Sequence, residues 1–506
     1  MSLMDRYRAS VASFARLPRA MHLILVIEFL STLHNHMVGG VSYQLILNEY
    51  KMSELELASL QALTSPIRIV AGLVVAPLVD MYGVRRVAIV SLSLSVLTHA
   101  LLAFGRSRLS LLVYLCVPAE APLGLALFTV ALKDLTTSRT RATAFALSTA
   151  LLNTGIVLSL HLIEVLRAVD VHIGGVLFSG LRLSVVASNA LIVVELALVV
   201  ATVHDVRAVD AEDEPAGYRL VRKELDDGSH TPFSLLGTMR KWVALAHAQR
   251  FWTVVLFNCC LIGARNMWGQ ASTLMITFLT RTYGEGVPVY SIRSINPTIN
   301  TVAPAVFAPF VAHLSTFGAV LPALWVFCAS PAPMAIAPSV ESAVAWMVFS
   351  GLGEAIWTPR TRAWTTEMAP VGQEGVFLTV VGLIPHIPAL AVSIFNGWLN
   401  QRFVPNCRDC RDSIGHFCTQ PHDLIDAPAG SAAHCSSPTG EQCSGLPQLP
   451  WSPGANTSHC PRSCAECPGW EAQPRTMFGI VLLMTISSPV AITLALPVLR
   501  AGHSLL

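Results

Sequence analysis

Apolar runs of about 20 residues recur along almost the whole chain, each long enough to cross a bilayer core of about 30 Å. Charged residues make up only 13% of the 506 residues, whereas an ordinary soluble domain carries about 25%. The sequence therefore predicts an all-α membrane protein that crosses the lipid bilayer many times. A net charge of +2, without a basic and aromatic stripe, argues against a nucleic-acid partner.

Hydropathy and helix-breaking residues predict twelve transmembrane helices. Their cores are 21–45, 57–79, 86–105, 109–132, 143–168, 178–203, 250–280, 291–314, 317–338, 341–362, 375–400 and 476–499. The polar gap 204–249 lacks an apolar period, which indicates a cytoplasmic linker with a short helix around Tyr218–Leu225. We expect residues 1–203 to form one six-helix half and residues 250–506 the other.

The distribution of basic residues predicts a cytoplasmic N-terminus. Lysine and arginine concentrate in the segments that this topology places inside, including Arg6, Arg8, Arg16 and Arg19 of the N-terminal tail. The same topology places the loop 403–475 outside the cytosol. We therefore expect a multi-pass protein of the plasma membrane or another secretory-pathway membrane, with an organelle membrane as the alternative.

Cysteine usage supports that topology. Eight of the 12 cysteines lie in the loop 403–475, where an oxidising compartment lets disulfides persist: Cys407, Cys410, Cys418, Cys435, Cys443, Cys460, Cys464 and Cys467. Asn456 begins an Asn-Thr-Ser glycosylation sequon in the same loop. The sequence predicts a glycosylated loop held by disulfides but does not choose the pairing.

A zinc site is the alternative interpretation of this loop. Two Cys-x-x-Cys pairs, at Cys407 and Cys464, have four histidines nearby in sequence: His416, His422, His434 and His459. We favour disulfides because of the compartment, and we expect the protein to hold no metal and no cofactor.

Two short segments relate the halves to each other and to a known family. VAPLVD (Val75–Asp80) and FAPFVA (Phe307–Ala312) occupy equivalent places in the predicted topology, as in transporters built from parallel repeats. The stretch APLVDMYGVRRVAI resembles the signature loop of the major facilitator superfamily, with matches at Asp80, Gly83, Arg85 and Arg86 and a departure at Ala76, where that family prefers glycine. The resemblance implies the major facilitator fold and a transport function. An ordinary charged loop is the alternative.

Physical chemistry fits the roles that this resemblance implies. Gly83 permits a tight turn, and Asp80 can pair with a cation or cap the start of a neighbouring helix. A second segment, Gly353–Ala389, is similar to helices 10 and 11 of proton-dependent oligopeptide transporters. Helix 1 lacks the Glu-x-x-Glu-Arg motif of that branch, so peptide specificity is not implied.

Ionisable residues inside the spans are the main functional candidates. A charge at mid-span costs about 2.5–3.5 kcal/mol on the insertion scale, whereas a leucine contributes only about 0.5 kcal/mol. Such residues are expected to face one another or a cavity, and the family's fold implies a central cavity between the halves. We expect the groups that bind substrate or couple protons to be Glu28, Asn35, His36, Glu120, Arg265, Asn266, Gln270, Asn300, Glu354 and His386.

Each candidate also has a purely structural interpretation. Asn and Gln within spans can simply bridge helices, for about 0.6 kcal/mol each, and His386 can be a packed histidine. Arg360 and Arg362 are interpreted as cytoplasmic anchors. Arg265 cannot lose its charge, so we expect it to bind a carboxylate of the solute or of the protein.

Glu354 carries the most specific mechanistic expectation. Loss of water favours the protonated form of a carboxyl group, and a nearby cation favours the ionised form. Glu354 could therefore pair with Arg265 in one state and be protonated in another. Gly351, Gly353 and Pro359 predict a helix that can bend there. The alternative is a fixed ion pair between helices.

These features predict a secondary active transporter, not an enzyme. The chain has no Gly-x-x-x-x-Gly-Lys-Ser/Thr loop for a nucleotide phosphate and no nucleophile–base motif. We expect a monomer that moves a small polar solute by alternating access, coupled to protons. The alternative is a receptor or scaffold that does not transport and binds a partner through the cysteine-rich loop.

The loop 403–475 should be extracytoplasmic and oxidised. Maleimide should leave its eight cysteines unlabelled in intact protein without reductant, and should label them after reduction. Labelling of several of these cysteines before reduction would contradict either the topology or the disulfides.

Overall fold

The computed structural model describes residues 18–50, 52, 54–117, 127–128, 131–132, 134–136, 141–173, 176–210, 218–222, 243, 247–283, 286–311, 314–368, 377, 381, 384, 386–404 and 473–503. Glu120 and the cysteine-rich loop, including Asn456, lie outside these residues. The side chains of Asp80 and His386 are also not described.

Helices account for most of the described chain, in the order that hydropathy predicts. The elements before residue 204 are α2 (Arg19–Glu49), α3 (Glu54–Phe104), α4 (Arg108–Cys116), α6 (Arg141–Leu166), β1 (Val171–Ile173), β2 (Val176–Phe178) and α7 (Gly180–Thr202). A two-stranded antiparallel hairpin follows, formed by β3 (Val206–Asp210) and β4 (Tyr218–Arg222). The remaining elements are α9 (Gln249–Cys260), α10 (Ile262–Gln270), the π-helix η1 (Ala271–Met275), α11 (Ile276–Tyr283), α12 (Val289–Val311), α13 (Thr316–Ala329), α14 (Ala332–Ile336), α15 (Val340–Glu367), α17 (His386–Phe403) and α19 (Pro474–His503).

Serine side chains define the starts of three of these helices. Ser107, Ser179 and Ser315 precede α4, α7 and α13, and each hydroxyl accepts a hydrogen bond from the backbone N–H three residues later. Such caps satisfy one of the four N–H groups that a helix start leaves without an intrahelical partner. Hydroxyl residues at the ends of the apolar runs therefore set where these helices begin.

The predicted second and third helices join at Gly83 within α3. Gly83 has φ +83° and ψ 162°, a backbone region that only glycine adopts readily. A Cβ atom at this position would lie 2.6 Å from Oδ2 of Asp205. That carboxylate accepts a hydrogen bond from the backbone N–H of Arg85 at 3.3 Å, and the Arg85 guanidinium donates to the Val200 carbonyl at 2.7 Å. The signature loop is therefore fastened to the end of α7.

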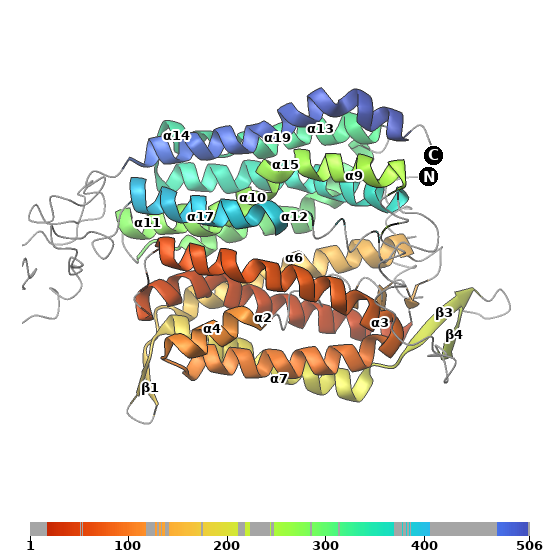
Figure 1. Ribbon diagram of the computed structural model, residues 1–506, viewed down its shortest axis with the longest axis horizontal. Coiled ribbons are helices and arrows are strands. Elements are labelled where there is room, and N and C mark those ends of the chain that lie inside the picture. Colours follow the sequence, from red (N-terminus) through yellow and green to blue (C-terminus); the bar gives the residue numbers. More distant parts are fainter. Residues whose placement is uncertain are drawn as a thin grey trace, which may run out of the picture.

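The helices pack as two groups in chain order, which we call the N-terminal group (α2–α7) and the C-terminal group (α9–α19). Figure 1 shows the red-to-yellow N-terminal group below the green-to-blue C-terminal group. In the first, α2 packs against α6 and α7, and α3 packs against α4 and α7. In the second, α15 packs against α12 and α13, and α19 packs against α9, α10, α13 and α14. The groups meet where α6 contacts α12 and where α3 contacts α17.

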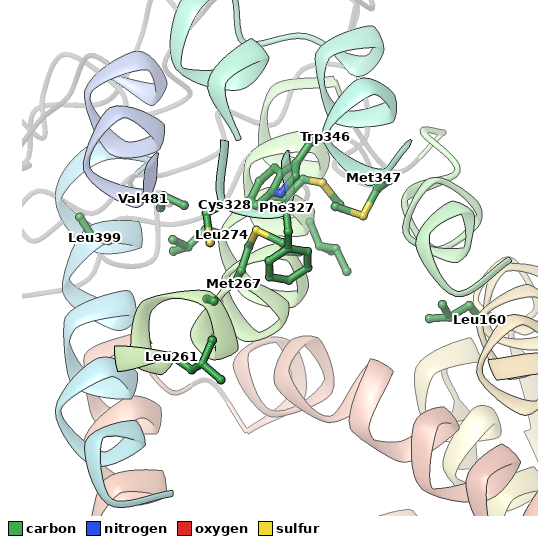
Figure 2. Packing of buried hydrophobic residues seen from close by; sticks show 14 of the residues in the cluster. Leu160, Leu261, Met267, Leu274, Phe327, Cys328, Trp346, Met347, Leu399 and Val481 are labelled. Carbon is green, nitrogen blue, oxygen red and sulfur yellow. The ribbon is translucent and has the colours of Figure 1, made fainter. Parts of the chain in front are cut away.

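The apolar core of the C-terminal group explains its tight packing. Figure 2 shows Met267 of α10, Leu274 of η1 and Phe327 of α13 lying together, with Val481 of α19 nearby. These four side chains are buried. Burying apolar surface contributes about 25 cal/mol per Å², although in lipid the gain comes mainly from close packing.

The linker differs from the sequence prediction. We expected a short helix around Tyr218–Leu225, but Tyr218–Arg222 is strand β4 and pairs with β3. Tyr218 and Val221 are typical strand residues, and pairing with Val206–Asp210 satisfies their backbone groups, which hydropathy alone does not reveal. The β1–β2 and β3–β4 hairpins lie at opposite ends of the bundle in Figure 1, as the predicted topology requires for the two ends of α7.

Within the described residues, six helices are long and apolar enough to cross a membrane: Arg19–Glu49, Tyr82–Phe104, Leu147–Leu166, Gly180–Thr202, Thr316–Ile336 and Pro474–Arg500. The other predicted spans are polar, interrupted or only partly described. The number twelve and the domain division at 204–249 stay predictions.

Replacing Gly83 with alanine should destabilise the protein. The conformation costs a residue with a Cβ atom about 1–3 kcal/mol, and the new Cβ would collide with the Asp205 carboxylate. The measurement is the melting temperature of the purified full-length protein in detergent. Gly479→Ala in α19 is the matched control, because nothing lies within 4 Å of the added Cβ. Equal melting temperatures for the two variants would contradict the role of Gly83.

Candidate functional site

Glu354 of α15 lies at the centre of a hydrogen-bond network. The indole Nε1 of Trp268 donates to Oε2 of Glu354 at 3.0 Å, and Nδ2 of Asn296 donates to the same oxygen at 3.2 Å. Asn296 also donates to the Ser350 hydroxyl at 3.0 Å, and Nδ2 of Asn300 donates to Oδ1 of Asn296 at 3.2 Å. Asn300 is thus part of this network, and α10, α12 and α15 together hold one carboxylate with neutral donors.

Two glycines bring these helices close enough for the network to form. A Cβ atom on Gly351 would lie 2.9 Å from the Ile299 Cβ of α12, and one on Gly353 would lie 2.6 Å from the Phe327 nitrogen of α13. Both glycines therefore permit close helix contacts, as small residues do in membrane bundles. In this structure α15 continues as a helix through Pro359, and the expected ability of this helix to bend stays a prediction.

Arg362 is a site residue that the sequence interpretation missed. We interpreted it only as a cytoplasmic anchor, and its charge also interacts electrostatically with both Glu354 and Glu28. Arg362 lies about two turns beyond Glu354 on the same helix, and that spacing was the available signal. Arg362 therefore gives Glu354 a cationic neighbour other than Arg265.

Glu28 contributes the second carboxylate, from the N-terminal group. It is 7% exposed, and the Ser148 hydroxyl of α6 donates to its Oε1 at 2.8 Å. Within the described part of the chain, its Oε2 has no hydrogen-bond partner. A buried carboxylate with one oxygen unsatisfied is costly, so this atom is available to a proton or a ligand.

Arg265 lies in the same region but does not pair with Glu354 in this structure. Its Nη2 donates to Oδ1 of Asn258 at 2.8 Å, and its charge interacts unfavourably with Arg362. Among the described residues, its Nε has no hydrogen-bond partner. The site therefore contains two arginines and two glutamates, with donor capacity left on Arg265.

The other predicted residues are divided among several places. His36 faces the charge of Arg293, Asn266 bonds to its own helix at the Ile262 carbonyl, and buried Gln270 donates to the Met484 sulfur of α19 at 3.7 Å. Asn35 lines a separate cavity beside α7. The structure brings Glu28, Asn300 and Glu354 into the charged region near Arg265, and it does not bring Gln270 or Asn35 there.

The two groups are also joined at the end of the bundle that the sequence predicts to be extracytoplasmic. Oε2 of Glu164 in α6 accepts hydrogen bonds from the backbone N–H groups of Tyr290 at 2.9 Å and Ser291 at 3.3 Å, in the first turn of α12. Arg167 pairs with Oε1 of Glu164 at 2.9 Å and donates to the Val287 carbonyl at 2.7 Å. We call these five residues the outer latch.

Two further hydrogen bonds join the groups at the same end. Asn400 of α17 donates to the Tyr43 hydroxyl of α2 at 3.1 Å, and Gln44 of α2 donates to Thr277 of α11 at 3.5 Å. A carboxylate at a helix start, as in the outer latch, is favoured both by the free N–H groups and by the helix dipole. Together these contacts hold this end closed.

Solved structures resemble this arrangement over nearly the whole chain. A bacterial homolog of the human lysosomal transporter Spinster, in an inward-facing and unoccupied conformation, aligns with a TM-score of 0.62 and 14% identity, covering 96% of this chain and 97% of that chain. The POT family transporter PepTSo aligns with a TM-score of 0.59 and 10% identity, covering 96% and 99%. The nucleoside transporter NupG aligns with a TM-score of 0.57 and 11% identity, covering 96% and 99%. At these identities the likeness shows the fold alone.

The sequence comparisons identify the family. A search of curated proteins found no match. The family model described as Major Facilitator Superfamily matches residues 24–393, which is most of the chain. The predicted fold class is therefore confirmed, and the chain is a multi-pass membrane transporter rather than an enzyme: it belongs to the major facilitator superfamily.

Proposed function

We propose that this protein is a secondary active transporter that moves a small polar solute by alternating access, coupled to protons. The observation that carries the proposal is that two carboxylates from different helix groups, half-buried Glu354 and buried Glu28, both interact electrostatically with Arg362. Charges inside a membrane are costly and are retained where they bind ions or solutes. A scaffold has no need to retain them, and this favours transport over the alternative of a partner-binding receptor.

The site chemistry favours a solute that carries an anionic group. Arg265 has a donor left over and cannot lose its charge, so it suits a carboxylate or a similar anion. Glu28 has a free acceptor, and Trp268 presents a partly exposed ring beside Glu354. A zwitterion or an organic anion fits these groups. The structural neighbours include a nucleoside transporter and a peptide transporter.

Alternating access requires the two helix groups to separate at one end while they close at the other. The outer latch and the Tyr43–Asn400 contact close the predicted outer end, which supports an inward-facing state. We propose that these contacts break once in each cycle and that the protein works as a monomer in the plasma membrane or another secretory-pathway membrane.

Glu164→Ala should shift the conformational equilibrium toward an outward-open state. The variant removes charge-assisted hydrogen bonds across the groups, worth about 1.5 kcal/mol or more, which corresponds to roughly a tenfold change in population. The measurement is the rate at which an impermeant maleimide labels a cysteine placed at Gln44. Glu56→Ala, an exposed glutamate at the same end, is the control. Equal labelling rates for the two variants would contradict the latch.

Glu354→Gln should separate solute movement from proton movement. Glutamine keeps an oxygen that can accept from Trp268 and Asn296 but cannot ionise. We therefore expect normal folding, preserved solute counterflow in liposomes, and loss of accumulation driven by a pH gradient. Glu341→Gln, an exposed glutamate in the first turn of the same helix, should behave as the wild type.

Two outcomes of that experiment would contradict the proposal. Intact pH-driven accumulation in Glu354→Gln would show that this carboxyl does not couple protons. Poor expression with a lowered melting temperature would indicate a structural ion pair instead. Absence of counterflow in the wild type, across amino acids, peptides, sugars and organic acids, would favour the receptor.

A further inference from the structure

A buried acid–histidine pair lies outside the Glu354 network, within the N-terminal group. Nε2 of His34 in α2 lies 2.8 Å from Oε2 of Glu195 in α7, and each side chain is only 1% exposed. The Ser31 side chain also hydrogen-bonds to the Glu195 carboxylate. Both partners are side chains that can gain or lose a proton.

A small cavity adjoins this pair. Its volume is about 30 Å³, and its polar lining includes Ser31, Asn35, Ser91 and Ser95, beside His34 and Glu195. A water molecule needs at least about 10–15 Å³ and two or more polar partners. The cavity therefore has both the space and the hydroxyl groups to bring a water molecule to the carboxylate.

Few other titratable groups approach the pair in the described chain. His99 of α3 lies with its ring centroid 6.3 Å from that of His34, and its Nδ1 contacts the Ser95 carbonyl of its own helix at 2.8 Å. Tyr114 of α4 stacks edge-on with His99 at 5.8 Å, and His36 interacts electrostatically with His34 along α2. The elements packed against the pair thus contribute two further histidines and a tyrosine.

A second ion pair in the same helices shows what a purely structural bridge looks like. Arg182 of α7 is 2% exposed, and its guanidinium donates to Glu49 at 2.7 Å and to the carbonyls of Ala103 and Gly105 at 2.8 and 2.9 Å. This arginine cannot release its proton, and its partners match its fork of donors. In the His34–Glu195 pair, by contrast, both side chains can release a proton, and neither presents a fork of donors that its partners match.

We propose that His34 and Glu195 form a proton-binding site of their own. With neutral imidazole and ionised carboxylate the pair carries one negative charge, and uptake of one proton makes the pair neutral. A neutral pair is far less costly inside the bundle. A water molecule in the cavity and the serine hydroxyls would pass the proton to the pair. The His34–Glu195 pair adds a second proton-binding site to the proposed proton coupling. Its role in transport rests on the proposed function, whereas its binding of a proton does not.

Infrared difference spectroscopy tests proton binding directly. The purified full-length protein, without solute, is taken from about pH 9 to about pH 5, a range that brackets ordinary histidine titration. The wild type should gain a protonated carboxyl band that Glu195→Gln lacks and that Glu354→Gln retains. His34→Gln should move the midpoint of that band by about one pH unit or more, because the partner that shares the proton is gone.

His99→Gln is the matched control and should leave the band in place, because His99 contacts its own helix rather than Glu195. A difference spectrum that is the same in Glu195→Gln and the wild type would overturn the proposal. If Glu195→Gln does not fold, an unchanged midpoint in His34→Gln overturns it. Since no transport is measured, failure here leaves the role of Glu354 standing, and failure of the Glu354 experiment leaves this site standing.

Discussion

The cost of holding charge inside an apolar bundle is the constraint on which this structure depends. A buried ion must be matched by partners or must be able to become neutral. The bundle contains both solutions. Arg182 is matched by Glu49 and two backbone carbonyls, so it fastens α2, α3 and α7 together at one end. Glu28 and Arg265 each keep one polar atom without a partner in the described chain.

This difference between matched and unmatched ions separates the structural residues from the residues that we propose to be functional more sharply than their position inside a span does. The sequence placed Glu28, Arg265 and Glu354 among the charged residues inside the spans, and the structure does bring them into one region. The sequence could not show that Gln270 contacts Met484 of α19. Helical periodicity predicts which residues share a face of a helix, but not which neighbouring helix that face contacts. It also gave no reason to link His34 with Glu195, which are distant in sequence and meet only through the packing of α2 on α7.

Much of the fold follows from the sequence because membrane insertion imposes long apolar helices. Hydropathy located the helices, and glycine at position 83 predicted the turn that φ +83° confirms. The features that the sequence did not predict depend on contacts between segments that are distant in the chain. The β3–β4 hairpin depends on pairing between separate segments. The close contacts of Gly351 and Gly353 with Ile299 and Phe327 were not foreseen from the sequence, and the bending expected there stays a prediction. Arg362 was assigned from its place near a helix end, without its partners.

The position of Arg362 suggests how the two helix groups communicate. The donors to Glu354, Trp268 and Asn296, belong to the same group as Glu354 and are tied to it by close helix packing. Glu28 belongs to the other group, so rigid movement of one group against the other would leave the hydrogen bonds of Glu354 intact while changing the distance between Arg362 and Glu28. Coulomb energy varies inversely with the distance between two charges. As Arg362 moves away from Glu28, the Glu28 carboxylate loses a cationic neighbour while Glu354 keeps the same one, so in the proposed cycle Glu28 would hold a proton more readily in the separated state.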